Sequence, residues 1–112
     1  MFRDDYLMRQ IEQLAAFLAR AAGFTAGGAP AQALRELEQA WDQLLGDVPR
    51  ELVDVLDVAT LSSMLGSVER RRAAAQLLLE EARARLALGD PRAAACQRRA
   101  RELAAFRQPP ET

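Results

Sequence analysis

Apolar residues recur along most of this chain at spacings of three and four, the period of a helix that buries one face. The first such segment is expected to run from about Asp4 to Ala22, with Asp4 or Asp5 as its cap and Gly23 as its end. Its apolar stripe consists of Leu7, Ile11, Leu14 and Leu18. The pattern therefore predicts a long amphipathic helix at the start of the chain.

A second helix is expected to begin at Pro30, after a loop that contains Gly27 and Gly28, and to end at Gly46. Its apolar positions gather on one side: Ala33, Leu34, Leu37, Ala40, Trp41, Leu44 and Leu45. The segment 49–65 that follows is short and rich in apolar residues. A possible break at Leu56-Asp57-Val58 leaves open whether this segment forms one kinked helix or two.

The stretch from Ser67 to Phe106 has the pattern of two helices joined by a tight turn. Gly89 in that turn suits the left-handed end of a helix, Asp90 suits a cap, and Pro91 suits a first helical turn. The expected buried stripes are Val68, Ala75, Leu78, Leu79, Ala82 and Leu86 before the turn, and Ala93, Cys96, Ala100 and Leu103 after it. An antiparallel helical hairpin follows from this pattern.

Composition agrees with an all-α fold of five or six helices. Half of the 112 residues are hydrophobic but only 5% are aromatic, and the apolar share is mainly Ala and Leu, which favour helix over strand. A chain of this length is expected to form one domain. We place that domain at residues 1–107 and expect 108–112 to be a flexible C-terminal tail.

Charge is nearly balanced overall and unevenly distributed along the chain. The net charge is −1, but residues 1–66 carry ten acids and five arginines, whereas residues 67–112 carry ten arginines and six acids. The balance argues against a general polyanion-binding protein. The uneven distribution is compatible with solvated helix faces, with head-to-tail pairing or with an acidic partner.

The residue types that most enzyme sites need are scarce. The chain has no histidine, which excludes a Ser-His-Asp or Cys-His pair and an imidazole metal ligand. Its single cysteine, Cys96, falls on an Ala-rich helix stripe and is expected to be a small core residue, with a reactive thiol near Arg98 and Arg99 as the alternative. We predict a non-enzymatic protein with no cofactor and no metal site.

Two parts of the chain resemble tetratricopeptide hairpins, in which small residues lie where paired helices cross near a Gly-Asp turn. The resemblance covers roughly residues 7–45 and 68–106, with the short helical insert unmatched, and the turn glycines Gly28 and Gly89 are too far apart for a regular array. The whole chain also resembles a family of short bacterial helical proteins, a domain of unknown function. Asp5-Tyr6-Leu7-Met8-Arg9-Gln10-Ile11 and Gly28-x-x-x-x-Ala33-Leu34 carry this second resemblance, which implies a helical fold and no catalytic residues.

The function predicted from these observations is a helical protein–protein interaction module that self-associates as a homodimer. Two hairpins form too short a stack to bury both ends, so Phe17 and Trp41 are candidate self-association residues. Four arginines are candidates for binding an acidic peptide or protein: Arg83, Arg85, Arg98 and Arg101. The alternative is a nucleic-acid-associated factor that uses the same Arg-rich hairpin, and the lack of aromatic residues interleaved with the arginines argues against it. The acidic, amphipathic first residues do not have the pattern of a signal peptide, and no apolar run approaches the roughly 20 residues of a transmembrane helix. We therefore predict a cytoplasmic protein that does not bind a membrane.

Overall fold

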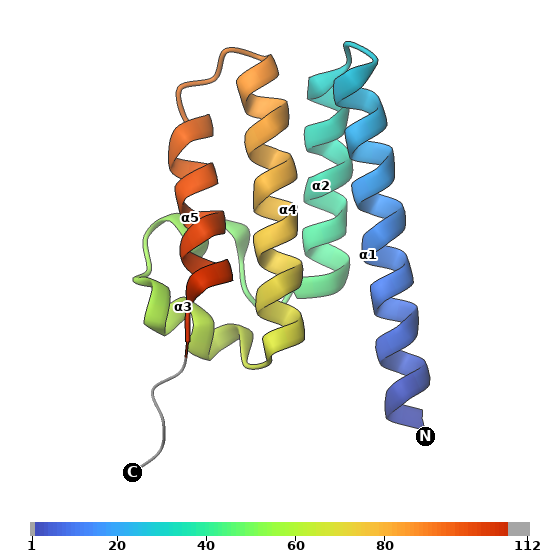
Figure 1. The fold of residues 1–112 in the computed structure, drawn as a ribbon, viewed down its shortest axis with the longest axis vertical. Coiled ribbons are helices and arrows are strands. Elements are labelled where there is room, and N and C mark those ends of the chain that lie inside the picture. Colours follow the sequence, from blue (N-terminus) through green and yellow to red (C-terminus); the bar gives the residue numbers. More distant parts are fainter. Residues whose placement is uncertain (1, 108–112) are drawn as a thin grey trace.

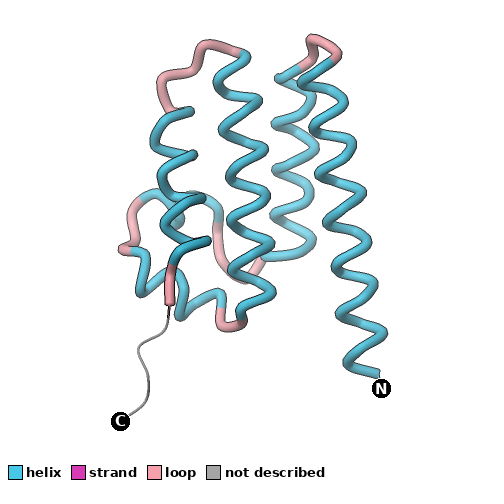
Figure 2. The backbone as a smooth tube through the Cα atoms, in the orientation of Figure 1, coloured by secondary structure: helices cyan, strands magenta, loops and turns pink. Residues whose placement is uncertain are grey.

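The structure is a computed structural model that describes residues 2–107 of the chain. Over these residues it contains five α-helices, one short 3-10 helix and no strand (Figure 2). The elements are α1 (Phe2–Ala26), α2 (Pro30–Leu45), η1 (Arg50–Asp54), α3 (Val58–Leu65), α4 (Val68–Ala87) and α5 (Ala93–Ala105). The prediction of an all-α fold is therefore confirmed, and the expected tail 108–112 lies outside the described residues.

The four long helices form two antiparallel hairpins, α1–α2 and α4–α5, which lie side by side (Figure 1). Helix α4 occupies the middle of the arrangement and packs against α1, α2 and α5. The insert between the hairpins forms η1 and the separate helix α3, and α3 packs against α4 and α5. The open question about residues 49–65 is settled as a 3-10 turn followed by an α-helix.

Most helix boundaries follow the predicted signals. The exceptions are both ends of α1, which begins at Phe2 rather than at a cap on Asp4 or Asp5, and the start of α5, which begins at Ala93, two residues after Pro91. Ser67 caps α4 by accepting a hydrogen bond from the Arg70 backbone N–H at 3.1 Å, and Gly89 after α4 has a φ of +70°. The prediction that Gly23 ends the first helix is wrong, because α1 continues to Ala26. A single glycine costs only about 1 kcal/mol within a helix. The left-handed conformation that does require glycine lies at Gly28, with a φ of +83°.

The core gathers around α4, which is buried on more than one side. Its buried residues include both alanines and leucines on neighbouring helical positions: Ala74, Ala75, Leu77, Leu78, Ala82 and Ala84. The predicted stripe of α4 is correct at its centre and wrong at its ends, since Val68 is 47% exposed and Leu86 is 74% exposed. A central helix flanked by α2 and α5 buries a wide sector, so a single narrow stripe does not describe it. The stripe predicted for α5 is confirmed in full, with Ala93, Cys96, Ala100 and Leu103 all buried.

Candidate interaction site

The first three turns of α1 carry apolar residues that the rest of the chain leaves largely uncovered. Helix α1 has 25 residues and its antiparallel partner α2 has only 16, joined by the three-residue loop 27–29. At about 1.5 Å per residue, the difference between 25 and 16 residues makes α1 about 13 Å longer than α2. The start of α1 accordingly extends past the end of α2 (Figure 1). None of the side chains of residues 5–16 is buried, and Phe17 is the first buried residue that follows them. We call residues 5–14 the arm.

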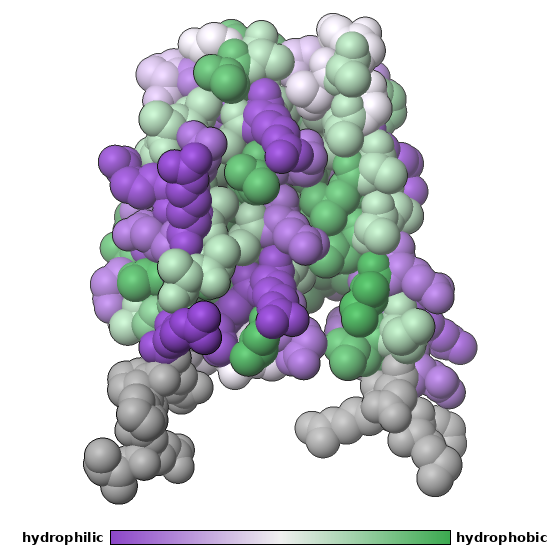
Figure 3. Space-filling model, in the orientation of Figure 1, coloured by the Kyte–Doolittle hydropathy of each residue, from purple (hydrophilic) through white to green (hydrophobic). Residues whose placement is uncertain are grey.

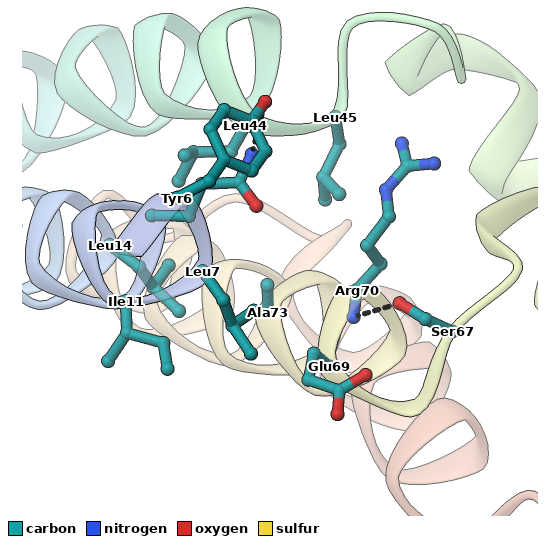
Figure 4. A pocket seen from close by; sticks show the side chains of 11 residues that line it. Tyr6, Leu7, Ile11, Leu14, Leu44, Leu45, Ser67, Glu69, Arg70 and Ala73 are labelled. Atoms are coloured by element: carbon teal, nitrogen blue, oxygen red, sulfur yellow. Dashed lines mark hydrogen bonds between the residues drawn. The ribbon is translucent and has the colours of Figure 1, made fainter. Parts of the chain in front are cut away.

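A groove runs between the arm and the beginning of α4, closed at one end by the last turn of α2. The groove has a volume of about 410 Å³. Its apolar lining comes from three helices: Leu7, Ile11 and Leu14 of α1, Leu44 and Leu45 of α2, and Ala73 of α4 (Figure 4). We call this feature the arm groove. Apolar surface follows the side of α1 that faces α4 in the space-filling view (Figure 3).

The polar side chains at the arm groove are largely engaged with one another. The Arg70 guanidinium is hydrogen-bonded to both carboxylate oxygens of Asp47, and this hydrogen bonding lowers the pKa of Asp47. The Gln10 amide donates to the Tyr6 hydroxyl at 3.1 Å, one turn apart on the arm. Glu69 is exposed at the rim. The groove therefore offers apolar contact rather than a polar reaction centre.

Phe17 and Trp41, the residues predicted to mediate self-association, are part of the core instead. Phe17 is 5% exposed and Trp41 is 3% exposed within a single chain. The Trp41 indole N–H donates a hydrogen bond to the Val48 carbonyl at 2.7 Å. The Arg50 guanidinium lies over the Trp41 ring, with its Cζ atom 5.8 Å from the ring centroid. Their size suited either a core or an interface, and contacts within the chain cover both. These two side chains are therefore not available for self-association in the folded chain.

A partly buried ionic cluster links the insert to the second hairpin, and the sequence pattern did not reveal its long-range pair. Glu81 of α4 receives hydrogen bonds from Arg50 of η1 at 2.8 and 3.1 Å and from Arg85 at 2.9 Å. Arg85 also binds Asp90 in the α4–α5 turn at 2.7 Å. Burial disfavours the charged form of Glu81, but the hydrogen bonds and charges of Arg50 and Arg85 outweigh it and lower its pKa. The cluster therefore holds η1 and the turn against α4.

Cys96 lies at the edge of this ionic cluster with its sulfur turned inward. The thiol is within hydrogen-bonding distance of the Leu78 carbonyl at 3.2 Å and of the Glu81 carboxylate at 3.5 Å. Burial, assisted by the negative charge of Glu81, raises the pKa of Cys96 to about 12. A thiol that stays protonated and covered has the properties of a structural cysteine.

A second, larger groove of about 910 Å³ lies between α2 and η1 on one side and α5 on the other, with α4 beneath. We call it the charged groove. Its α2 wall carries the acids Glu38 and Asp42, and its α5 wall carries Arg98 and Arg99. Counted over all its lining residues, it holds six carboxylates and five guanidinium groups. The charged groove therefore has no excess of positive charge.

The structure does not bring the four candidate partner-binding arginines onto one free basic surface. Arg83 pairs with Glu80 at 2.6 Å, and Arg85 belongs to the ionic cluster. Arg98 lines the charged groove opposite acids, whereas Arg101 is exposed outside it. Within residues 2–107, neither Arg98 nor Arg101 forms an ion pair. The prediction of an acidic partner therefore depends on these two arginines.

The sequence pattern predicted an apolar stripe on the first helix but did not show which of its residues the fold leaves uncovered. Apolar residues spaced by three and four occur both on helix faces that the chain itself covers and on faces that only a partner would cover. The feature of the sequence that could have indicated the groove is the difference in length between the first two helices. Gly28 and Pro30 before the second helix and Gly46 after it make that helix much shorter than the first.

Among residues 2–107, no three or more of the residue types His, Cys, Asp and Glu are grouped so that they could hold a metal ion. None of the helices there is both long enough and apolar enough to cross a membrane. Comparisons of the chain with protein-family models, with curated proteins and with solved structures found no match.

Proposed function

We propose that this protein is a non-enzymatic helical interaction module that self-associates through the arm groove. The observation that carries the proposal is an apolar helix face without a cover: Ile11 is 49% exposed in the middle of a stripe that continues into the core. Tyr6 and Met8 on the same three turns are 65% and 56% exposed. Exposed apolar residues that form a continuous surface beside a groove are typical of protein-interaction sites.

The energetic argument rests on the area of apolar surface that association would remove from water. Each Å² of buried apolar surface contributes about 25 cal/mol, so covering several half-exposed side chains is worth a few kcal/mol before the cost of association is subtracted. The arm itself bears few charges on the groove side, since Asp5, Arg9 and Glu12 lie away from the stripe of Leu7 and Ile11. Covering the arm therefore desolvates little charge on α1, and the charged groups that a partner meets at the groove are Glu69 and Arg70 of α4.

Self-association is tested by measuring mass as a function of concentration. Sedimentation equilibrium on the full chain is expected to show a rise from 12.3 kDa toward twice that mass as the protein concentration increases. The Ile11→Glu variant places a charge in the centre of the uncovered stripe and is expected to weaken association at least tenfold.

Ala16→Glu is the matched control for this variant. Ala16 is exposed on α1 and does not line the arm groove, so the same charge there is expected to leave the association unchanged. Wild-type protein that stays at 12.3 kDa at every concentration would overturn the proposed self-association. Equal weakening of the association by both variants would show that the arm groove is not the surface that mediates it.

The cytoplasm is the compartment that we propose for this module. The reason is that one cysteine permits no internal disulfide, which suits a reducing environment. Fractionation of the native cells, read with an antibody against the protein, tests this location.

A further inference from the structure

We infer that the outer face of α1 packs against the same face of a second copy of this chain, with the two α1 helices side by side and parallel. The inference rests on the self-association proposed above and adds which face of α1 meets the partner and in which direction the partner lies. It starts from two features of a single chain, an apolar helix face that no described element covers and four free charges near it.

The outer face of α1 is apolar over about four turns, on the side of the helix opposite to the buried Phe17. Its residues recur at spacings of three and four and are all exposed: Met8, Ile11, Ala15, Ala19 and Ala22. Figure 3 shows this face as a green band along α1 with purple side chains on both sides. Ile11 also lines the arm groove, so a partner on the outer face reaches the mouth of that groove.

Two free charges follow the edge of the outer face that is turned away from α4. Arg9 and Glu12 are exposed, and neither forms an ion pair with a described side chain. Successive helical residues are rotated by about 100°, which places both on the other side of α1 from Leu7 and Leu14 in the arm groove. Arg9 and Glu12 therefore point away from α4 of their own chain.

Two free charges in the reverse order lie on the exposed side of α4. Glu69 and Arg72 are exposed, are three positions apart like the free pair on α1, and form no ion pair within the described part of the chain. Helices α1 and α4 run in the same direction (Figure 1). Gln10 of α1 and Arg70 of α4 line the same groove, so the two free pairs lie at similar heights along their helices.

A twofold axis parallel to the helices brings these charges together. In this isologous contact each outer face packs on the other, and α4 of each subunit lies beside the charged edge of its partner's α1. Because the heights agree, Arg9 meets Glu69 of the partner subunit, and Glu12 meets Arg72 of the partner subunit. Each pair occurs twice in the dimer. Charges that no residue of the same chain neutralises are therefore paired by the second copy.

An antiparallel contact through the same face is less favourable. Its twofold axis would be perpendicular to the helices and would place the α4 helices of both subunits on one side of the interface. The long exposed side chains of Arg72, Gln76 and Arg83 from both copies would then have to fit between them. In the parallel contact, α4 meets only the partner's α1, where alanines allow helices to approach to the usual 8–10 Å.

Charge reversal tests the pairing. In the dimer, Glu12→Arg places a second positive charge opposite Arg72, and Arg72→Glu places a second negative charge opposite Glu12. Each variant alone is expected to associate about fivefold more weakly than wild type in sedimentation equilibrium at low ionic strength, since exposed ion pairs are individually weak. An equimolar mixture of the two variants is expected to recover most of the wild-type association, because each subunit supplies the charge that its partner lacks.

Glu38→Arg is the matched control, because it makes the same charge change on α2, in the charged groove. This variant is expected to associate like wild type. Since Glu12 points away from α4 of its own chain, recovery in the mixture reports a contact between subunits.

Disulfide formation tests the direction. In the parallel contact each residue of the outer face lies opposite its own copy, and disulfides need Cα atoms within about 7 Å. Ala15→Cys and Ala22→Cys are therefore both expected to link under mild oxidation, at least several-fold faster than the exposed control Ala16→Cys beside the outer face. In an antiparallel contact with its axis at Ala15, two copies of Ala22→Cys would be about 21 Å apart along the helix. The native Cys96 does not interfere, because it is only 4% exposed.

The possible results separate this contact from the self-association itself. Linking by only one of the two outer-face cysteines, or a mixture of charge variants as weak as its components, would overturn the inference. A sample that sedimentation shows to be dimeric but that links through neither cysteine would also overturn it and leave the proposed self-association standing. A wild-type protein that remains monomeric at every concentration would overturn both.

Discussion

The two hairpins of this protein share a construction and differ in how it is completed. In each, the first helix is longer than the second, with 25 and 16 residues in α1–α2 and 20 and 13 residues in α4–α5. In the second hairpin, α3 packs against both helices and the ionic cluster holds η1 to α4. In the first hairpin, the described residues place only the beginning of α4 beside the arm, across the arm groove.

This difference explains why similar apolar patterns have different outcomes. Leu77 and Leu78 of α4 are 1% and 0% exposed, whereas Ile11 of α1 is half-exposed. Both segments repeat apolar residues at helical spacing, so the pattern by itself does not separate them. The difference lies in what surrounds each helix, and it leaves the arm accessible for contact.

The largest expected difference between the hairpins is in the reactivity of a thiol placed in each. Raising the pKa of Cys96 from 9.0 to about 12 lowers its thiolate fraction about a thousandfold at neutral pH. An Ile11→Cys thiol on the half-exposed arm has no comparable burial. At low protein concentration we therefore expect iodoacetamide to modify residue 11 of this variant about a thousandfold faster than Cys96, measured by mass spectrometry of peptides. Equal rates in folded protein would contradict the burial of Cys96, and unfolding in urea serves as the control that makes both thiols accessible.

A truncation in the core is expected to cost far more stability than a truncation on the arm. Trp41→Ala removes a buried aromatic side chain and its hydrogen bond to Val48, and should lower the free energy of unfolding by about 3–5 kcal/mol. Leu7→Ala on the arm should change it by less than ~1 kcal/mol in the monomer. Urea denaturation monitored by circular dichroism measures both values. Similar losses for the two variants would show that the arm belongs to the core.

The ionic cluster is expected to make a smaller contribution, and one that depends on pH. Glu81→Gln leaves Arg50 and Arg85 without their shared carboxylate and should cost about 1–3 kcal/mol near neutral pH. Because the pKa of Glu81 is lower in the folded protein than the value of about 4.3 in an unfolded chain, its contribution is complete above that value. The contribution is lost as the pH falls through the folded-state pKa. The difference in unfolding free energy between wild type and Glu81→Gln should therefore shrink in acid, and a difference independent of pH would contradict this account.

The smallest expected effect concerns the two glycines at the end of the first hairpin. Gly23 lies within α1 with open space around its Cα, so Gly23→Ala should stabilise the protein by roughly 0.5–1 kcal/mol. Gly28 has a φ of +83°, so Gly28→Ala should destabilise it by about 1 kcal/mol. Thermal unfolding of the two variants should shift the midpoint in opposite directions. A shift in the same direction would mean that Gly23 is not an ordinary helical position.

Local sequence determined most of the secondary structure of this protein. Apolar spacing, the cap at Ser67, the possible break at Leu56-Asp57-Val58, and the turn glycines Gly28 and Gly89 act over a few residues, and they located five helices and both hairpin turns. The stripe of α5 was also predictable, because that helix packs with one narrow face against its neighbours. Gly23 misled the prediction because the cost of one interior glycine is smaller than the stabilisation of the turns that follow it.

Tertiary structure decided which apolar residues are covered and which charges are paired. Phe17 and Trp41 became core residues because other helices pack over them, whereas Leu7 and Ile11 remained accessible because α2 ends before it reaches them. Arg50 and Glu81 are 31 positions apart, and only the folded chain brings them to 2.8 Å. Helical periodicity reports that a face is apolar, but burial depends on neighbours that are distant in the sequence. This is the physical reason why the fold was predictable here and the candidate interaction site was not.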